Sequence, residues 1–132
     1  MKANFSFVSV PSERTIRLRM QGEFDARSMS RFAEEYRRVC EEYSGRPHMV
    51  LADMRGTAPL KATTAEIFGE IIAYSRRRGV VCCAHLSDDT VQKLQASRLG
   101  RSISEYDETT FDVVSVDEAE RLFAERRPKL DG

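Results

Sequence analysis

The sequence predicts an α/β fold built on a mixed five-stranded sheet. Strand-like and helix-like segments alternate along most of the 132 residues, an order typical of parallel strands joined by right-handed helical crossovers. Two strand-like segments follow each other directly at the start, which predicts one antiparallel hairpin. The length and the 41% of hydrophobic residues suit one core. We therefore expect a single domain over residues 1–132, with about four helices, a core over about 5–125 and a C-terminal tail.

The opening hairpin is predicted from two short patterns. Residues 5–10 read FSFVSV, and residues 15–20 alternate apolar side chains with Arg17 and Arg19, as strands with one buried face do. Proline and serine at residues 11–13 favour a turn between them. Arg17 and Arg19 are therefore expected to face water or a partner.

A long amphipathic helix follows Gly22. Apolar residues recur at steps of three and four from Phe24 to Tyr43, a period typical of a helix that packs on one side. Asp25 or Ser28 is suited to cap its first turn. The stretch SGRP at residues 44–47 ends it.

The middle of the chain predicts two inner strands separated by a second helix. Residues 48–54 contain the run MVLA, and residues 80–86 read VVCCAHL; both are apolar on both faces, as central strands are. Between them a helix with an apolar stripe runs from about residue 63 and stops at Gly79.

The C-terminal part predicts two more helices and the last strand. Residues 88–99 begin with capping residues and give a weaker amphipathic helix that ends at Gly100. Residues 111–116 are expected to form a strand, and Asp117 to start the final helix. From Pro128 onward we expect a frayed tail.

Composition excludes several functional classes. Twenty-one Lys and Arg balance 21 Asp and Glu, so no bulk field attracts nucleic acid or acidic lipid, and we expect no nucleic-acid partner. No stretch of roughly 20 apolar residues predicts a membrane span. Three cysteines and an N-terminus without a secretory pattern favour the cytoplasm.

Few residues suggest chemistry. Asp53 ends a predicted inner strand and Lys61 lies in the following loop, where ligands of open α/β sheets gather; with His85 they form the only catalytic hypothesis, against which a capping role for Asp53 is favoured. Cys40, Cys82 and Cys83 are interpreted mainly as core residues. No metal-ligand spacing and no phosphate-binding glycine pattern occurs, so no metal and no cofactor is predicted.

The region from Thr57 to Thr64 is more informative. Thr63 and Thr64 lie where a helix start exposes backbone N–H groups, a place for a cap or for a phosphoryl group. A phosphate there would change the charge of a docking surface by nearly two units. The arginines at residues 76–78 close the same helix, where they stabilise its negative end.

Three segments together resemble the STAS domain, the fold of bacterial anti-sigma factor antagonists and of sulphate-transporter tails. Residues 16–25 (IRLRMQGEFD) are similar to the family's strand ending in Gly-x-hydrophobic-Asp. Residues 50–56 (VLADMRG) resemble its central strand and Asp-hydrophobic-Ser-Gly loop, and residues 111–119 (FDVVSVDEA) its last strand and helix start. The resemblance covers about residues 5–125.

The resemblance implies a non-enzymatic regulatory module that docks a partner. In signalling members a helix begins with Asp-Ser-Ser-Gly, and a kinase that is also an anti-sigma factor phosphorylates the second serine. Here the matching stretch reads Lys61-Ala62-Thr63-Thr64, so Thr63 is the candidate phosphoacceptor, although lysine replaces the acidic residue and threonine the glycine. Asp53, Lys61, Thr63 and Thr64 are the expected docking residues, the partner is of the anti-sigma kinase type, and a homodimer stays open.

A second hypothesis is a carrier of a small apolar ligand or lipid. It follows from the likeness to divergent STAS-like and SEC14-like bacterial proteins, and it requires a cavity among the apolar helix faces around Phe32, Tyr36, Phe68 and Ile72. A filled core is the simpler interpretation of those stripes.

Overall fold

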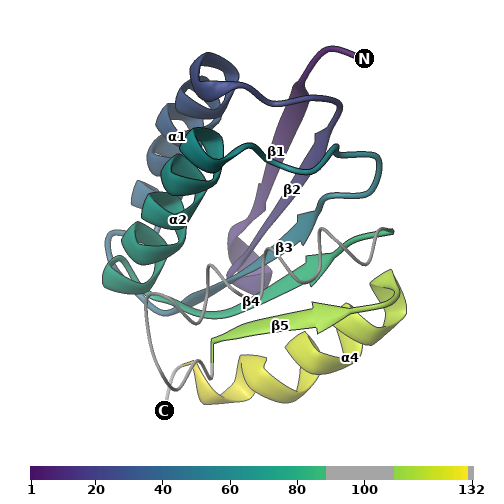
Figure 1. The fold of residues 1–132 in the computed structure, drawn as a ribbon. Helices are drawn as coiled ribbons and strands as arrows, with labels where there is room; N and C mark the ends of the chain where they lie inside the picture. Colours follow the sequence, from purple (N-terminus) through teal and green to yellow (C-terminus); the bar gives the residue numbers. More distant parts are fainter. Residues whose placement is uncertain (89–108, 131–132) are drawn as a thin grey trace.

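The fold is a mixed five-stranded sheet, as predicted. A computed structural model describes residues 1–88 and 109–130. Its strands lie side by side in sequence order (Figure 1): β1 (Asn4–Val10), β2 (Thr15–Gln21), β3 (His48–Asp53), β4 (Val80–Leu86) and β5 (Thr110–Val113). β1 and β2 pair antiparallel, and each later neighbour pairs parallel. The hairpin and the inner strands are therefore confirmed.

Helices cover both faces of the sheet. α1 (Ala26–Glu41) and α2 (Ala62–Arg77) lie on one face, and α4 (Val116–Arg126) lies on the other (Figure 1). The helix predicted over residues 88–99 lies, beyond its first residue, outside the described residues. A sheet with helices on both faces is the expected outcome of strands joined by helical crossovers.

α1 begins where the capping residues predict. The Oδ1 of Asp25 accepts a hydrogen bond from the backbone N–H of Ser28 at 2.8 Å, and the Oγ of Ser28 accepts one from the N–H of Asp25 at 2.9 Å. This capping box satisfies two N–H groups of the helix start. Of the two candidate caps, Asp25 is thus the N-cap residue, and Ser28, the third residue of the helix, completes the capping box.

The larger core lies between the sheet and α1 with α2. Phe32 is 1% exposed at its centre, stacked on Phe7 with ring centroids 5.3 Å apart and meeting the edge of Phe5 at 5.5 Å. Such aromatic pairs add to the free energy of burial. The smaller core lies under α4, where Phe123 and Ala119 pack on Met49, Leu51 and Cys82.

The boundary between the last strand and α4 differs from the prediction. β5 ends at Val113, three residues earlier than expected, and α4 begins at Val116, one residue earlier than expected. The reason is Ser115, whose Oγ accepts a hydrogen bond from the N–H of Glu118 at 3.1 Å and so caps α4. The apolar Val114 and Val116 are exposed at 74% and 38%, so the strand-like pattern FDVVSV was misleading.

Residues 127–130 are packed, which contradicts the frayed tail that we expected from Pro128 onward. A short 3-10 turn over Arg127–Lys129 brings Leu130 into the core under α4, where it is 9% exposed. The Nε of Arg127 donates to the carbonyl of Glu13 at 3.0 Å, and Arg14 donates to the carbonyl of Leu130 at 3.3 Å. The turn between β1 and β2 thus holds the C-terminal turn.

Candidate functional site

The loop that leads from β3 to α2 is anchored to the end of β2. Thr57 donates from its Oγ1 to the carbonyl of Met20 at 2.9 Å. The N–H of Gly22 donates to Gly56 at 2.9 Å, and the N–H of Ala58 donates to Gly22 at 3.0 Å. These bonds tie the loop before α2 to the segment that follows β2, and so fix where α2 starts.

The two threonines at the start of α2 differ in burial. Thr63 is exposed at the second position of the helix, whereas Thr64 is 2% exposed and packed inward. Lys61, at the N-cap position, is exposed and makes no capping hydrogen bond through its side chain. The N-cap side chain therefore supplies no acceptor for the first N–H groups of α2, and Thr63 presents its hydroxyl at this helix start.

A hollow of about 410 Å³ lies between the start of α1 and the start of α2. Both helix starts and the loop before α2 contribute to its walls: Glu23, Phe24, Asp25, Ala26, Ala58, Pro59, Lys61, Thr63 and Thr64. Three of the four predicted docking residues thus line one hollow.

Asp53, the fourth predicted docking residue, does not line it. Its carboxylate accepts hydrogen bonds from Arg19 at 2.7 Å and from the Nη2 of Arg55 at 2.8 Å. Partial burial raises the pKa of Asp53, but the hydrogen bonds and charge of Arg55, together with the charge of Arg19, outweigh this and hold the pKa below its ordinary value. Asp53 is therefore an ion-pair anchor for two arginines.

The residues of the catalytic hypothesis are separated by their places in the fold. His85 is 2% exposed in β4, with its ring 6.3 Å from that of Phe68 under α2. Lys61 lines the hollow, and Asp53 is bound by its arginines. Within residues 1–88 and 109–130, no three His, Cys, Asp or Glu side chains are grouped as a metal site requires.

The buried cysteines have the properties of core residues. Burial raises the pKa of Cys40 and of Cys82 to about 11, so both stay thiols at neutral pH. The Sγ of Cys40 lies 3.4 Å from the Nε2 of His48, whose Nδ1 lies 2.8 Å from the carbonyl of Arg46. A ring that donates from Nδ1 to this carbonyl accepts from the thiol at Nε2, which satisfies all three groups.

The residues proposed for an apolar ligand pocket are packed against one another. Phe32, Tyr36, Phe68 and Ile72 are between 1% and 8% exposed and belong to one core cluster. Tyr36 also bonds Ser75 at 2.6 Å between the two helices. None of the four lines the hollow between the starts of α1 and α2, so the filled-core interpretation has the better support.

The far ends of α1 and α2 are tied by a cluster that the sequence did not reveal. Arg78 donates two hydrogen bonds to Glu41, at 2.7 and 2.8 Å, and Tyr74 donates a third at 2.6 Å. The hydrogen bonds from Arg78 and then Tyr74 lower the pKa of Glu41 from 4.5 to about 2. Arg78 therefore has a structural partner, while Arg77 is exposed at the helix end.

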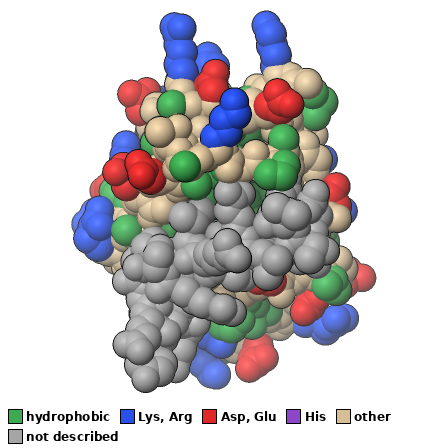
Figure 2. All heavy atoms as spheres, in the orientation of Figure 1, with side chains coloured by type: hydrophobic (Ala, Val, Ile, Leu, Met, Phe, Trp, Pro, Cys, Tyr) green, Lys and Arg blue, Asp and Glu red, His purple; other side chains and the backbone are tan. Residues whose placement is uncertain are grey.

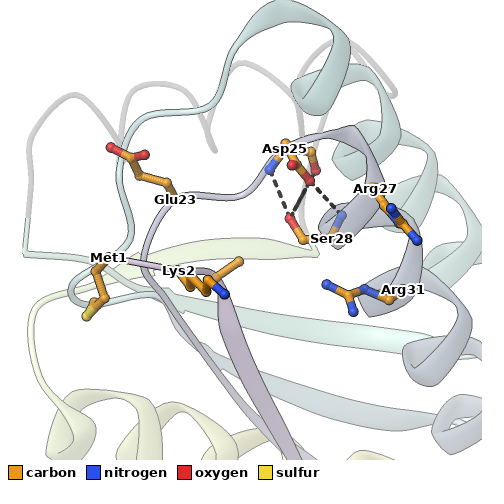
Figure 3. A pocket seen from close by; sticks show the side chains of 8 residues that line it. Met1, Lys2, Glu23, Asp25, Arg27, Ser28 and Arg31 are labelled. Atoms are coloured by element: carbon orange, nitrogen blue, oxygen red, sulfur yellow. Dashed lines mark hydrogen bonds between the residues drawn. The ribbon is translucent and has the colours of Figure 1, made fainter.

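A second hollow, of about 490 Å³, adjoins the first at the start of α1 and was also not predicted. Figure 3 shows the side chains around it, which include Lys2, Glu23, Asp25, Arg27 and Arg31. Glu23 and Asp25 line both hollows, so the two hollows are neighbours at the start of α1.

The visible surface carries charges of both signs. On the face shown in Figure 2, acidic and basic side chains are interleaved around the described part of the molecule, as expected from equal numbers of opposite charges. Among the described residues, no helix has both the length and the apolar character needed to cross a membrane.

Comparison with known proteins supports the fold. The chain is similar to the crystal structure of an anti-sigma factor antagonist from Mycobacterium paratuberculosis, with a TM-score of 0.58 and 10% sequence identity. The similarity covers 92% of this chain and 95% of that chain. No family model matches the sequence, and no curated protein matches it. The resemblance to the STAS domain is thus confirmed at the level of the fold.

Proposed function

We propose that this chain is a non-enzymatic regulatory module that docks a protein partner through the loop and helix start from Thr57 to Thr64. The observation that carries the proposal is the exposed Thr63 at an uncapped helix start beside a hollow. The likeness in fold to an anti-sigma factor antagonist supports it. By analogy the partner is a protein of the anti-sigma kinase type, and the module acts as one domain in the cytoplasm.

Thr63 is the phosphoacceptor in this proposal. A phosphate on its hydroxyl would add about two negative charges at the N-terminus of α2, where the N-cap side chain makes no capping hydrogen bond, and near the ammonium group of Lys61. The carboxylates of Glu23 and Asp25 line the same hollow. A phosphate would therefore be held by one wall of the hollow and would add to the negative charge of the other.

The test measures partner binding by forms of the protein that differ at Thr63. Anti-sigma kinases encoded in the same genome are titrated by calorimetry against the natural protein, Thr63→Ala and Thr63→Glu. We expect the first two to bind alike and Thr63→Glu to bind about tenfold or more weakly. Incubation with ATP should place phosphate on Thr63, identified by mass spectrometry.

Ser30 supplies the matched control, because it is an exposed hydroxyl on α1 that lines neither hollow. Ser30→Ala and Ser30→Glu should bind as the natural protein does. If all forms bind the kinase equally, phosphorylation of Thr63 does not control docking. If no kinase tested binds, the proposed class of partner is contradicted.

A further inference from the structure

The second hollow gathers cationic side chains from two separate segments. Lys2 comes from the start of the chain, and Arg27 and Arg31 lie one turn apart on α1. In Figure 3 the guanidinium of Arg31 extends toward the ammonium group of Lys2, whereas the side chain of Arg27 points away from Lys2. Like charges that converge in this way repel one another unless an anion lies between them.

These cations have no anionic partner among the described residues. The side chains of Lys2, Arg27 and Arg31 make no hydrogen bond or ion pair with any described residue, although Glu23 and Asp25 line the same hollow. Other described arginines do pair with carboxylates, namely Arg17, Arg19, Arg38, Arg55 and Arg78. The start of α1 instead places three cations around one hollow without such a pair.

Their positions on α1 also oppose helix stability. Arg27 is the second residue of the helix, next to the positive end of the helix dipole, where cations are unfavourable. Arg27 and Arg31 are four residues apart, a spacing at which like charges repel. No acidic residue occupies the first turn of α1 itself. Residues that break local stability rules in this way are typical of binding sites.

We infer that this cationic bank, formed by Lys2, Arg27 and Arg31, binds an acidic segment of the protein partner. Carboxylates of that segment would be placed between the converging cations and would also relieve the unfavourable charge at the start of α1. This inference rests on the proposed function, because it names the chemistry of the partner that docks beside Thr63.

Size and charge favour a polypeptide segment over a small anion. The hollow of about 490 Å³ shares Glu23 and Asp25 with the hollow of about 410 Å³ beside Thr63. A single small anion would fill little of two neighbouring hollows of this volume. The carboxylates of Glu23 and Asp25 would repel a uniformly anionic strand such as a nucleic acid, whereas a polypeptide can present acidic residues at one end and neutral or basic residues at the other.

The test uses a fluorescently labelled peptide of about twelve residues, half of them Glu, which reaches about 40 Å when extended. Its binding is measured by fluorescence anisotropy and its site by amide NMR shifts. We expect shifts at Lys2, Glu23, Arg27 and Arg31, and binding that weakens as salt rises from about 0.05 to about 0.3 M. The double variant Arg27→Glu with Arg31→Glu should bind about tenfold or more weakly.

Arg37→Glu with Arg38→Glu is the matched control, because it changes the net charge equally on the same helix but away from both hollows. It should bind the peptide as the natural protein does. The Arg27 and Arg31 variant should melt at the same or a higher temperature, because it removes cations from the helix start. Unchanged peptide binding by that variant, equal loss in the control, or tighter binding of inorganic phosphate than of the peptide would overturn the inference.

The same variants separate this inference from the proposed function. If Thr63→Glu loses kinase binding while the Arg27 and Arg31 variant binds the kinase fully, docking at Thr63 is supported and the role of the cationic bank is contradicted. If the peptide binds in a way that depends on Arg27 and Arg31, but the protein binds no kinase, the inference about the cationic bank stands and the proposed kinase partner is contradicted.

Discussion

At the scale of single residues, adjacent identical side chains have different roles. Thr63 and Thr64 are equivalent in the sequence, yet Thr63 is exposed and Thr64 is 2% exposed. The helical rotation of about 100° per residue explains the difference, since one side chain of the pair meets the core and the other meets water. Of the two hydroxyl-bearing side chains, only that of Thr63 is therefore exposed.

Acidic substitutions at the two threonines should have unequal effects on stability. Thr64→Glu should lower the free energy of unfolding by about 3 kcal/mol or more, because it buries a charge without a partner. Thr63→Glu should change it by less than about 0.5 kcal/mol, since it adds an exposed anion to a helix start. Urea denaturation measures both, and equal losses would contradict the burial difference.

Glu41 should make stability depend on pH in the acidic range. Its pKa in the folded chain is about 2 against an ordinary 4.5, so its contribution is fully present above about pH 5 and is lost as the pH falls toward 2. Glu41→Gln should therefore melt at a lower temperature than the natural protein at pH 7, and the difference should vanish near pH 2.

A direct NMR titration of the Glu41 carboxylate checks the same point. A pKa near 4.5 would show that Arg78 and Tyr74 do not hold it in solution. Glu42 is the matched control, because it is the exposed neighbour of Glu41. Glu42→Gln should not reproduce the pH-dependent difference.

At the scale of elements, a single cap decides where β5 ends and α4 begins. The pattern FDVVSV reads as one strand, but Ser115 bonds the N–H of Glu118 and starts the helix there. The N–H of Val114 in turn donates to the carboxylate of Glu118 at 2.8 Å. Local side-chain bonds of this kind compete with strand pairing and determine the boundary.

Removal of this cap should destabilise the protein. Ser115→Ala should lower the free energy of unfolding by about 1 kcal/mol, because the N–H of Glu118 loses its acceptor. Ser115→Asp, which also caps well, should retain most of the stability. Urea denaturation of the three forms provides the measurement, and equal losses for both variants would contradict the capping role.

At the scale of the whole molecule, the turn between β1 and β2 meets the C-terminal turn. The turn between β1 and β2 contributes Glu13 and Arg14, which bond Arg127 and the carbonyl of Leu130. Leu130 then closes the core under α4. Contacts between residues more than a hundred positions apart give this last turn its order.

Shortening the Leu130 side chain should reduce the stability of the whole domain. Leu130→Ala should lower the free energy of unfolding by about 2 kcal/mol, because a largely buried side chain leaves a cavity at the edge of the core. Lys129→Ala, at the exposed neighbour, should have little effect. Thermal and urea unfolding of both variants measures the difference, and equal behaviour would show that the C-terminal turn does not pack.

The sequence by itself determined the fold class, the hairpin, the inner strands and the helices α1 and α2. Periodicity carries this information, since a repeat of two or of about 3.6 residues reports which side of an element is buried. The capping pair at Asp25 and Ser28 and the helix stop at Gly79 were local enough to predict as well.

Only the tertiary structure decided which of these side chains meet. It exposed Thr63 and buried Thr64, paired Asp53 with Arg19 and Arg55, and brought Lys2 to the start of α1. It also packed Leu130 where the sequence indicated a frayed end. The physical reason is that local pattern specifies the burial of an element, whereas the pairing of distant charges and the burial of a chain end depend on how the sheet and helices come together.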